Sequence, residues 1–358
     1  MNIYQFFRPF IFKIEPEKAH NLALNYLKFL PKFSSLLSSS KNYENLNNCV
    51  FNLNFSNPVG MSAGFDKNAE IIKSLFNFGF GFVEAGTTTP VAQAGNEQPR
   101  IFRLTEDQAL INRLGFNNLG ANYFYENLTK INKTSSQIIG VNIGKNKDTI
   151  DSVADYILLL EKFYNYADYI TINISSPNTK NLRDLQNEDL LNDFLQKISQ
   201  HKNNLQKISH KSTPILLKIA PDLEFEQQKN IAKIVLDNAI DGVIISNTTI
   251  ARDFNLKSSK SLEIGGLSGK PLFEKSNEIL RNFYRLTEGR IPLIGVGGIN
   301  NAEDAYTKIK NGASLIQIYS AFIYQGFSLV EKIKKQLSEN LKKDGFKNIS
   351  EAIGSNVK

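Results

Sequence analysis

Side chains that could bind a flat heterocycle and anionic groups recur where short apolar runs of this sequence end. The run YITINIS is followed by Ser176 and Asn178, and the run ILLKIA contains Lys218. A polar residue within an apolar strand is costly unless something hydrogen-bonds to it. One such residue usually marks a turn or a satisfied strand end, but their recurrence predicts a shared pocket of amides, hydroxyls and lysines. The residues concerned are Asp66, Lys67, Thr87, Asn142, Asn173, Ser175, Ser176, Asn178, Lys218, Ser246, Asn247, Thr248, Gly297, Gly298, Tyr319 and Ser320.

Two segments near the end of the chain, GVGGIN and IYSAF, are typical of loops that bind one phosphate through backbone N–H groups. GVGGIN is not a dinucleotide fingerprint, because Asn300 stands where the third glycine would be. GGLSGKP is not a nucleoside-triphosphate loop, because only three residues separate Gly265 from Gly269 and Pro271 follows Lys270. A flavin mononucleotide therefore fits these loops better than either alternative.

Eight apolar runs alternate with helical stretches from about residue 58 onward, which is the pattern of strands and helices around a parallel sheet. Most runs are rich in Ile and Val, as expected for strands covered on both faces. Eight strands close a (β/α)8 barrel, whose active site lies at the carboxyl ends of the strands. The predicted fold is therefore an α/β TIM barrel with a small N-terminal helical extension. The runs span residues 58–64, 81–87, 138–144, 169–175, 215–220, 242–248, 293–299 and 315–320.

The segments between the runs predict amphipathic helices and one insertion. Apolar residues three or four apart place one stripe of each helix against the sheet. The segment from Thr88 to roughly Ser136 is too long for a simple crossover, and we expect an insertion at the barrel mouth followed by a helix. The stripes include Val153, Ile157, Leu160 and Phe163, and Ile231, Ile234, Val235 and Asn238.

Composition excludes several classes of protein. With 41% hydrophobic and 22% charged residues the chain can bury a sizeable core. Its single cysteine, Cys49, cannot form an internal disulfide, and only three histidines accompany it, so we expect no metal site. The net charge of +7 comes from scattered residues with no basic block, which argues against nucleic-acid binding. The sequence contains neither a secretory signal pattern nor an apolar run of the roughly 18 to 20 residues that span a membrane.

A helical pair is predicted before the barrel. Apolar residues keep helical spacing from Ala19 to Leu30, between Pro16 and Pro31, and a shorter aromatic stripe precedes them. Such helices can pack on the barrel or lie at a lipid interface, and the residues alone favour neither. The helical stripe is Ala19, Leu22, Ala23, Tyr26, Leu27 and Leu30, and the aromatic stripe is Phe6, Phe7, Phe10, Ile11 and Ile14. Across residues 1–33 the charged residues are Arg8, Lys13, Lys18, Lys28 and Lys32 against Glu15 and Glu17.

Nine ordered motifs make the chain resemble dihydroorotate dehydrogenases over essentially its whole length. They are AGFDKN, EAGTTTP, RLGFNN, NISSPNT, LLKIAPDL, SNTT, GGLSG, GVGGI and IYSAFIYQG. The resemblance implies a barrel that holds FMN and oxidises (S)-dihydroorotate to orotate in pyrimidine biosynthesis. The implied FMN contacts are Ala63, Gly64, Phe65, Asp66, Lys67, Thr87, Asn142, Asn173, Lys218, Ser246, Gly269, Gly298, Tyr319 and Ser320. The implied substrate contacts are Lys67, Asn112, Arg113, Leu114, Gly115, Phe116, Asn173, Asn178, Asn247 and Thr248.

The identity of one residue in NISSPNT bears on the subclass. Soluble members of the resembling family, which use fumarate or NAD, have a cysteine base after the fourth strand, whereas quinone-dependent members have a serine. This chain has Ser176 there, so the resemblance implies Ser176 as the catalytic base, with Thr179 and Phe116 shaping a proton relay. A serine hydroxyl is a poor base unless its surroundings activate it. Phe65 and Ser62 are mild departures from the family pattern beside the flavin. The soluble class remains the alternative.

The resemblance also implies an arrangement of the chain and its partners. Residues 1–40 would dock on a membrane surface and form a quinone tunnel, residues 41–340 would form the barrel, and residues 341–358 a C-terminal tail. The electron acceptor would be ubiquinone or menaquinone. The protein would be a monomer that lies peripherally on the cytoplasmic face of the bacterial inner membrane.

Overall fold

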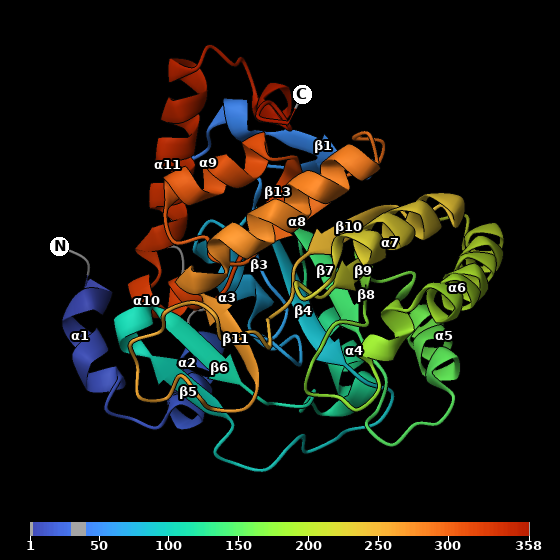
Figure 1. Ribbon diagram of the computed structural model, residues 1–358, viewed down its shortest axis with the longest axis horizontal. Helices are drawn as coiled ribbons and strands as arrows, with labels where there is room; N and C mark the ends of the chain where they lie inside the picture. Colours follow the sequence, from blue (N-terminus) through green and yellow to red (C-terminus); the bar gives the residue numbers. More distant parts are fainter. Residues whose placement is uncertain (1–2, 30–40, 358) are drawn as a thin grey trace.

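The computed structural model describes residues 3–29 and 41–357, and its centre is a closed barrel of eight parallel strands (Figure 1). Around the barrel the order is β3, β4, β7, β8, β9, β10, β12 and β13, and β13 pairs with β3 to close it. Each predicted run overlaps one of these strands, and only β4 and β13 extend beyond their runs, so the predicted barrel is confirmed. The strands are Val59–Met61 (β3), Phe82–Thr88 (β4), Ile138–Ile143 (β7), Tyr169–Asn173 (β8), Ile215–Ile219 (β9), Gly242–Ile245 (β10), Leu293–Val296 (β12) and Ala313–Ile318 (β13).

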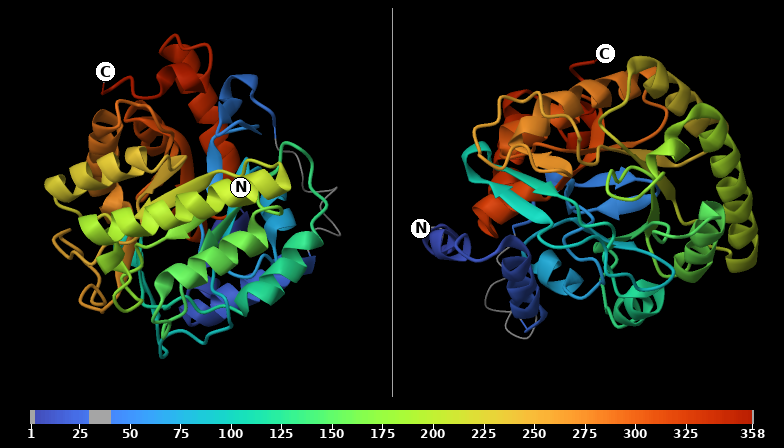
Figure 2. Two further views of the ribbon diagram at one scale, coloured as in Figure 1. Left: turned by 90° about the vertical axis from the view of Figure 1, so that its right-hand side faces the viewer. Right: turned by 60° about the horizontal axis from the view of Figure 1, so that its bottom comes forward.

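Helices cover the outside of the barrel (Figure 2). The predicted stripes face inward: Leu160 and Phe163 are fully buried, and so is Val235. Asn238, the last residue of its stripe, instead ends the helix, with its N–H bonded to the Ile234 carbonyl. The helices are Ile72–Asn77 (α3), Gly120–Thr129 (α4), Ser152–Phe163 (α5), Glu188–Ser209 (α6), Phe225–Asp237 (α7), Phe273–Leu286 (α8), Ala302–Lys310 (α9), Ser320–Gln325 (α10), Ser328–Lys343 (α11) and Ile349–Ala352 (α12).

The amino-terminal end of the barrel is closed by a hairpin that the sequence analysis did not predict. Its strands are Asn48–Val50 (β1) and Leu53–Phe55 (β2). Phe55 packs edge-on against Phe82, the first residue of β4, and Phe82 contacts Tyr169, the first residue of β8. Apolar side chains thus fill this end, and polar groups that bind ligands are left to the opposite rim.

The predicted insertion between the second and third barrel strands is followed by a helix, as expected, and it contains a small antiparallel sheet that was not predicted. Ile101–Leu104 (β5) pairs with Ala109–Asn112 (β6), and α4 follows. The sheet gains a third strand, Gly266–Gly269 (β11), from the loop after β10. Strand β11 was not predicted, because its glycines resemble a loop.

Two helices precede the barrel, Ile3–Ile11 (α1) and Pro16–Phe29 (α2), as predicted. Arg8 of α1 donates to the Tyr324 carbonyl of α10 at 3.1 Å. Glu17 of α2 forms an ion pair with Arg100 at 2.7 Å, and both side chains are about nine-tenths buried. Arg100 also donates to the carbonyls of Ala94 and Asn96, so one guanidinium joins α2 to the insertion. Leu30, Pro31 and Lys32 lie outside the described residues.

The C-terminal residues pack against the barrel. Helix α11 runs past residue 340 to Lys343, and the N–H of Gly354 donates to the Ile309 carbonyl of α9. Within residues 3–29 and 41–357, no helix is long and apolar enough to cross a membrane. The same part of the chain contains no group of three or more metal-ligating residues.

Candidate functional site

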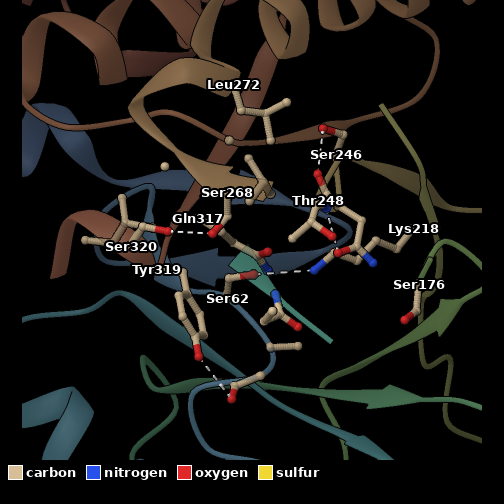
Figure 3. A pocket seen from close by; sticks show the side chains of 18 of the residues that line it. Ser62, Ser176, Lys218, Ser246, Thr248, Ser268, Leu272, Gln317, Tyr319 and Ser320 are labelled. Atoms are coloured by element: carbon tan, nitrogen blue, oxygen red, sulfur yellow. Dashed lines mark hydrogen bonds between the residues drawn. The ribbon is translucent and has the colours of Figure 1, made fainter. Parts of the chain in front are cut away.

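A cavity opens at the carboxyl ends of the barrel strands, where the sequence predicts the active site (Figure 3). Ser176 lies on the opposite side of the cavity from Tyr319 and Ser320, with Lys218 and Gln317 between them. Because the strands are parallel, side chains from distant segments reach the same rim. The predicted residues that line it are Ala63, Gly64, Lys67, Thr87, Asn112, Leu114, Gly115, Phe116, Asn173, Ser176, Asn178, Lys218, Ser246, Asn247, Thr248, Gly269, Gly298, Tyr319 and Ser320.

Four predicted contacts lie outside this lining. Phe65 packs edge-on against Tyr319, with ring centroids 5.9 Å apart. Asp66 is buried and accepts backbone hydrogen bonds from Glu70 and Ile71, which hold a turn.

The other two are held by neighbouring side chains. Arg113 forms an ion pair with Glu263 at 2.9 Å and lies over the Phe102 ring. Asn142 is fully buried behind the cavity and bonded to Thr87, which lines it. The local sequence motif cannot show which way each of these side chains points.

A buried carboxylate, Glu84, lies at the centre of the barrel and was missed by the sequence analysis. It has no exposed surface and accepts hydrogen bonds from Asn142 and Gln317, each at 2.8 Å. The hydroxyls of Tyr169 and Thr171 donate to it at 3.1 Å. A glutamate within the apolar run GFVEAGT was the signal that could have revealed it, because an isolated buried charge is too costly to keep.

Lysine Lys218 lies beside this carboxylate, with its Nζ 3.9 Å from Glu84 Oε1 and 3.4 Å from Ser62 Oγ. Burial lowers the pKa of Lys218, and the Glu84 charge acts in the opposite direction. Lys67 lines another part of the cavity, where burial lowers its pKa to about 8, with Glu17 raising it and Arg100 lowering it. Two cations thus face a cavity otherwise rich in neutral polar groups.

A chain of amides and hydroxyls connects the centre of the barrel with the cavity rim. Asn142 Oδ1 accepts from Thr87 Oγ1 at 2.6 Å and from Asn173 Nδ2 at 3.3 Å. Asn173 Oδ1 accepts from Ser175 Oγ at 2.9 Å, and Ser175 Oγ accepts from Asn247 Nδ2 at 2.9 Å. These bonds hold each side chain in one orientation before any ligand binds.

Ser176 lies in the loop after β8 and is buried, with 6% of its surface exposed. Its Oγ accepts the backbone N–H of Asn178 at 3.2 Å, so the loop fixes the hydroxyl. Thr179 is buried nearby in the same loop, and its Oγ1 has no hydrogen-bond partner among the described residues.

Glycines shape the part of the cavity that the sequence analysis assigned to a phosphate. Gly298 has a φ of +74°, and a Cβ there would lie 2.4 Å from the Phe273 backbone. Gly269 has a φ of +104° and is similarly crowded by the backbone of Gln108. Because side chains are excluded, a ligand can approach the backbone closely. Ser320, the first residue of α10, has its Oγ 2.9 Å from Ser268 Oγ.

Several lining residues were not among the predicted contacts. Gln317 is the most informative of them, because its Oε1 is buried without a hydrogen-bond partner in the described part of the chain. Its position in the apolar run LIQIYS could have signalled it. The further lining residues are Ser62, Ser268, Lys270, Leu272, Val296, Ile299, Asn300, Ile318 and Ala321, and Gly297 lines the cavity as the strand ends predicted.

A second cavity of about 500 Å³ lies between the N-terminal helices and the barrel. Its wall is mainly apolar and aromatic, from Phe7, Ala19 and Leu22 of the helices to Phe322 of α10. It shares four lining residues with the first cavity, so the two adjoin. The shared residues are Asn112, Leu114, Ser268 and Tyr319.

Known proteins similar to this chain include several with the same name. The family model described as dihydroorotate dehydrogenase matches residues 45–341. A protein of Rhodopseudomonas palustris (strain BisA53) named dihydroorotate dehydrogenase (quinone) is 46% identical over 350 residues, which cover 98% of this chain and 94% of that protein. A protein of Idiomarina loihiensis with the same name is also 46% identical, covering 94% of this chain and all of that protein. The solved structure of DHODH from Eimeria tenella in complex with ferulenol has a TM-score of 0.89 and 37% identity, covering 95% of each chain.

Proposed function

The chain belongs to the dihydroorotate dehydrogenase family and oxidises dihydroorotate to orotate with a quinone as electron acceptor, and we propose that FMN bound in the first cavity connects the two reactions. The family consists of flavoproteins. The observation that carries the proposal is the adjoining pair of cavities, one polar with two lysines and one apolar. The soluble class that uses fumarate or NAD is not favoured.

The first cavity has the features that FMN requires. The glycine turn at Gly298 admits no side chain, which suits close binding of a phosphate by the backbone. Gln317 Oε1 and Thr248 Oγ1 are buried polar atoms without a partner in the described residues, and both residues line the cavity. Lys218 offers a cation to a reduced flavin. When bound, FMN supplies the two-electron redox chemistry that side chains lack.

The substrate would bind near the insertion that covers the barrel mouth. Lys67 offers a cation to the carboxylate of dihydroorotate, and a cation that binds an anion gains charge-assisted strength. Asn112, Asn178 and Asn247 offer amide donors and acceptors for the ring. Asn178 Nδ2 donates to the Asn112 carbonyl at 3.1 Å, so the insertion and the loop after β8 position each other.

Ser176 is the proposed base that removes the proton from C5 of dihydroorotate, while the hydride leaves C6. The hydroxyl is held by the N–H of Asn178, which supports catalysis by placement rather than by intrinsic basicity. Thr179 Oγ1, buried in the same loop, is the proposed next group for the proton. Phe116 lines the same cavity and would shape this route.

Ser176→Ala should leave FMN binding intact and slow reduction of the flavin by dihydroorotate about 100-fold or more, because a general base contributes on that scale. Anaerobic stopped-flow measurement of flavin bleaching gives the rate, and the FMN content of the purified variant is the control. Bleaching at the wild-type rate would remove Ser176 from this role.

The second cavity is the proposed route for the quinone. Its apolar wall suits an isoprenoid tail, and Tyr319 and Asn112 at the shared boundary would bring the quinone ring near the flavin. His20 lines the cavity, and burial lowers its pKa to about 3, so the imidazole is neutral at pH 7. A neutral imidazole can exchange hydrogen bonds with a quinone carbonyl without adding a buried charge.

Ala19→Phe should obstruct this route, because Ala19 is buried and lines the second cavity. We expect reoxidation of the reduced flavin by a ubiquinone with an isoprenoid tail to slow about tenfold, which corresponds to about 1.4 kcal/mol of barrier. Reduction by dihydroorotate should be unchanged. Ala154→Phe, on the exposed side of α5, is the matched control. Equal quinone rates in both variants would refute the route.

The outer surface of α1 and α2 is the proposed membrane-docking surface. Phe6, Phe10 and Phe29 are each more than 60% exposed, and the basic residue Lys13 lies over the Phe10 ring. An aromatic helix surface with basic flanks suits the interface of a lipid bilayer. The stripe predicted on α2 is thus only partly buried: Ala19 and Leu27 pack inward, whereas Leu22 and Tyr26 remain exposed. We propose peripheral attachment to the cytoplasmic face of a bacterial inner membrane, with residues 1–40 as the docking segment of a monomer.

Phe10→Glu should weaken binding to vesicles of phosphatidylcholine and phosphatidylglycerol. The change replaces an aromatic ring that the bilayer would bury with a charge that the anionic lipid surface repels. Cosedimentation with the vesicles measures the effect, and we expect a loss of at least about fivefold. Phe225→Glu is the matched control, since Phe225 is similarly exposed but lies on α7. If both variants cosediment like the wild type, the proposed surface is wrong.

A further inference from the structure

Glu84 can accept hydrogen bonds through both carboxylate oxygens, and each oxygen is occupied by donors from the barrel wall. Oε1 accepts from Asn142 Nδ2, and Oε2 accepts from Gln317 Nε2, Tyr169 and Thr171. An ionised carboxylate accepts only, whereas a primary amide has one accepting and one donating end. The amides of Asn142 and Gln317 must therefore turn their NH₂ ends toward Glu84.

The orientation of Gln317 has a direct consequence for the first cavity. With its NH₂ end bound to Glu84, the carbonyl oxygen of Gln317 is the free end, and this atom is buried without a partner in residues 3–29 and 41–357. Gln317 is one of the residues that line this cavity (Figure 3). The cavity thus presents an acceptor at this point rather than a donor.

The orientation of Asn142 determines the orientation of the amides that follow it in the hydrogen-bond chain. Its carbonyl end accepts from Thr87 and from Asn173 Nδ2, so the carbonyl end of Asn173 faces the other way. That end accepts from the Ser175 hydroxyl and, at 3.4 Å, from Asn247 Nδ2. Asn247 Oδ1 then accepts the backbone N–H of Thr248 at 2.8 Å. Each amide can satisfy its neighbours in only one orientation.

We propose that Glu84 is a positioning residue, which sets the donor and acceptor ends of the amides around the cofactor and substrate sites. It acts through Asn142 and Gln317 and does not itself line the cavity. The inference rests on the proposed binding of FMN and dihydroorotate in this cavity. Under this proposal, the pattern of donors and acceptors that the ligands meet depends on Glu84, which lies behind the residues that contact them.

The variant Glu84→Gln tests this assignment while keeping the size of the side chain. Whichever way the new amide turns, its NH₂ end meets the NH₂ end of either Asn142 or Gln317, and one of them must invert or lose its bond. We expect FMN to dissociate from the holoenzyme at least about tenfold more readily, the equivalent of one unsatisfied buried bond. Recovery of FMN fluorescence on dilution measures this. The KM for dihydroorotate, measured per flavin-loaded enzyme, should also rise.

A double variant, Glu84→Gln with Asn142→Asp, exchanges carboxylate and amide across their 2.8 Å hydrogen bond. The new amide can then donate to position 142 and accept from Gln317, Tyr169 and Thr171, while the carboxylate at 142 still accepts from Thr87 and Asn173. All the original orientations are allowed again. We expect FMN affinity and the KM for dihydroorotate to return toward wild-type values, and this comparison also applies if the single variant does not fold.

Tyr169→Phe is the matched control for a merely structural role. It removes a donor to the same carboxylate from the apolar end of the barrel and leaves both amides in place. FMN affinity should stay within about threefold of wild type even if the melting temperature falls. The proposal is overturned if Glu84→Gln binds FMN as tightly as the wild type does. It is also overturned if the double variant binds FMN no more tightly than a weakened single variant, or fails to fold when the single variant also fails to fold. Failure of wild-type protein to bind FMN would instead refute the proposed function.

Discussion

A carboxylate with no access to water lies at the centre of the barrel, and the polar half of the molecule is arranged around it. Removing such a charge from water costs several kcal/mol, and this cost is offset only where hydrogen bonds satisfy both oxygens. Glu84 receives four side-chain donors and lies 3.9 Å from Lys218. Because these donors come from β7, β8 and β13, Lys218 from β9 and the carboxylate from β4, the charge ties most of the barrel into one polar network.

The network separates the two ends of the barrel. Below Glu84, toward the amino-terminal ends of the strands, Phe82 and Tyr169 pack with the β1–β2 hairpin and exclude polar ligands. Above it, the amides of Asn142 and Asn173 continue toward the rim where Ser176 and Lys67 lie. In the proposed site, dihydroorotate is oxidised over amides whose orientations are already fixed by hydrogen bonds. The apolar cavity under α1 and α2 adjoins the first cavity and is the proposed approach for the quinone.

Much of this arrangement was predictable from the sequence, and the failures have physical reasons. Local sequence patterns indicate the position and the number of the barrel strands. They also indicate that residues such as Asn173 and Ser176 lie at the rim, because the carboxyl ends of parallel strands meet at one end of a barrel whatever the conformation of the loops. The β1–β2 hairpin was missed because each of its strands has only three residues. Strand β11 was missed because its glycines resemble a loop and its partner β6 is distant in the sequence. The directions of Arg113 and Asn142 were also beyond prediction, because Glu263 and Glu84 determine them across 150 and 58 positions of the chain. The residues of α2 alone favoured neither packing nor lipid contact, and the helix has a buried side at Ala19 and Leu27 and an exposed apolar side at Leu22 and Tyr26.

The most direct test of the account is an anaerobic experiment on the wild-type, FMN-loaded protein, in which dihydroorotate is added first and possible electron acceptors afterwards. The account predicts that dihydroorotate bleaches the flavin absorbance, that a quinone restores it, and that fumarate and NAD do not. A flavin that dihydroorotate leaves oxidised, or one that fumarate or NAD reoxidises as readily as a quinone, would contradict it.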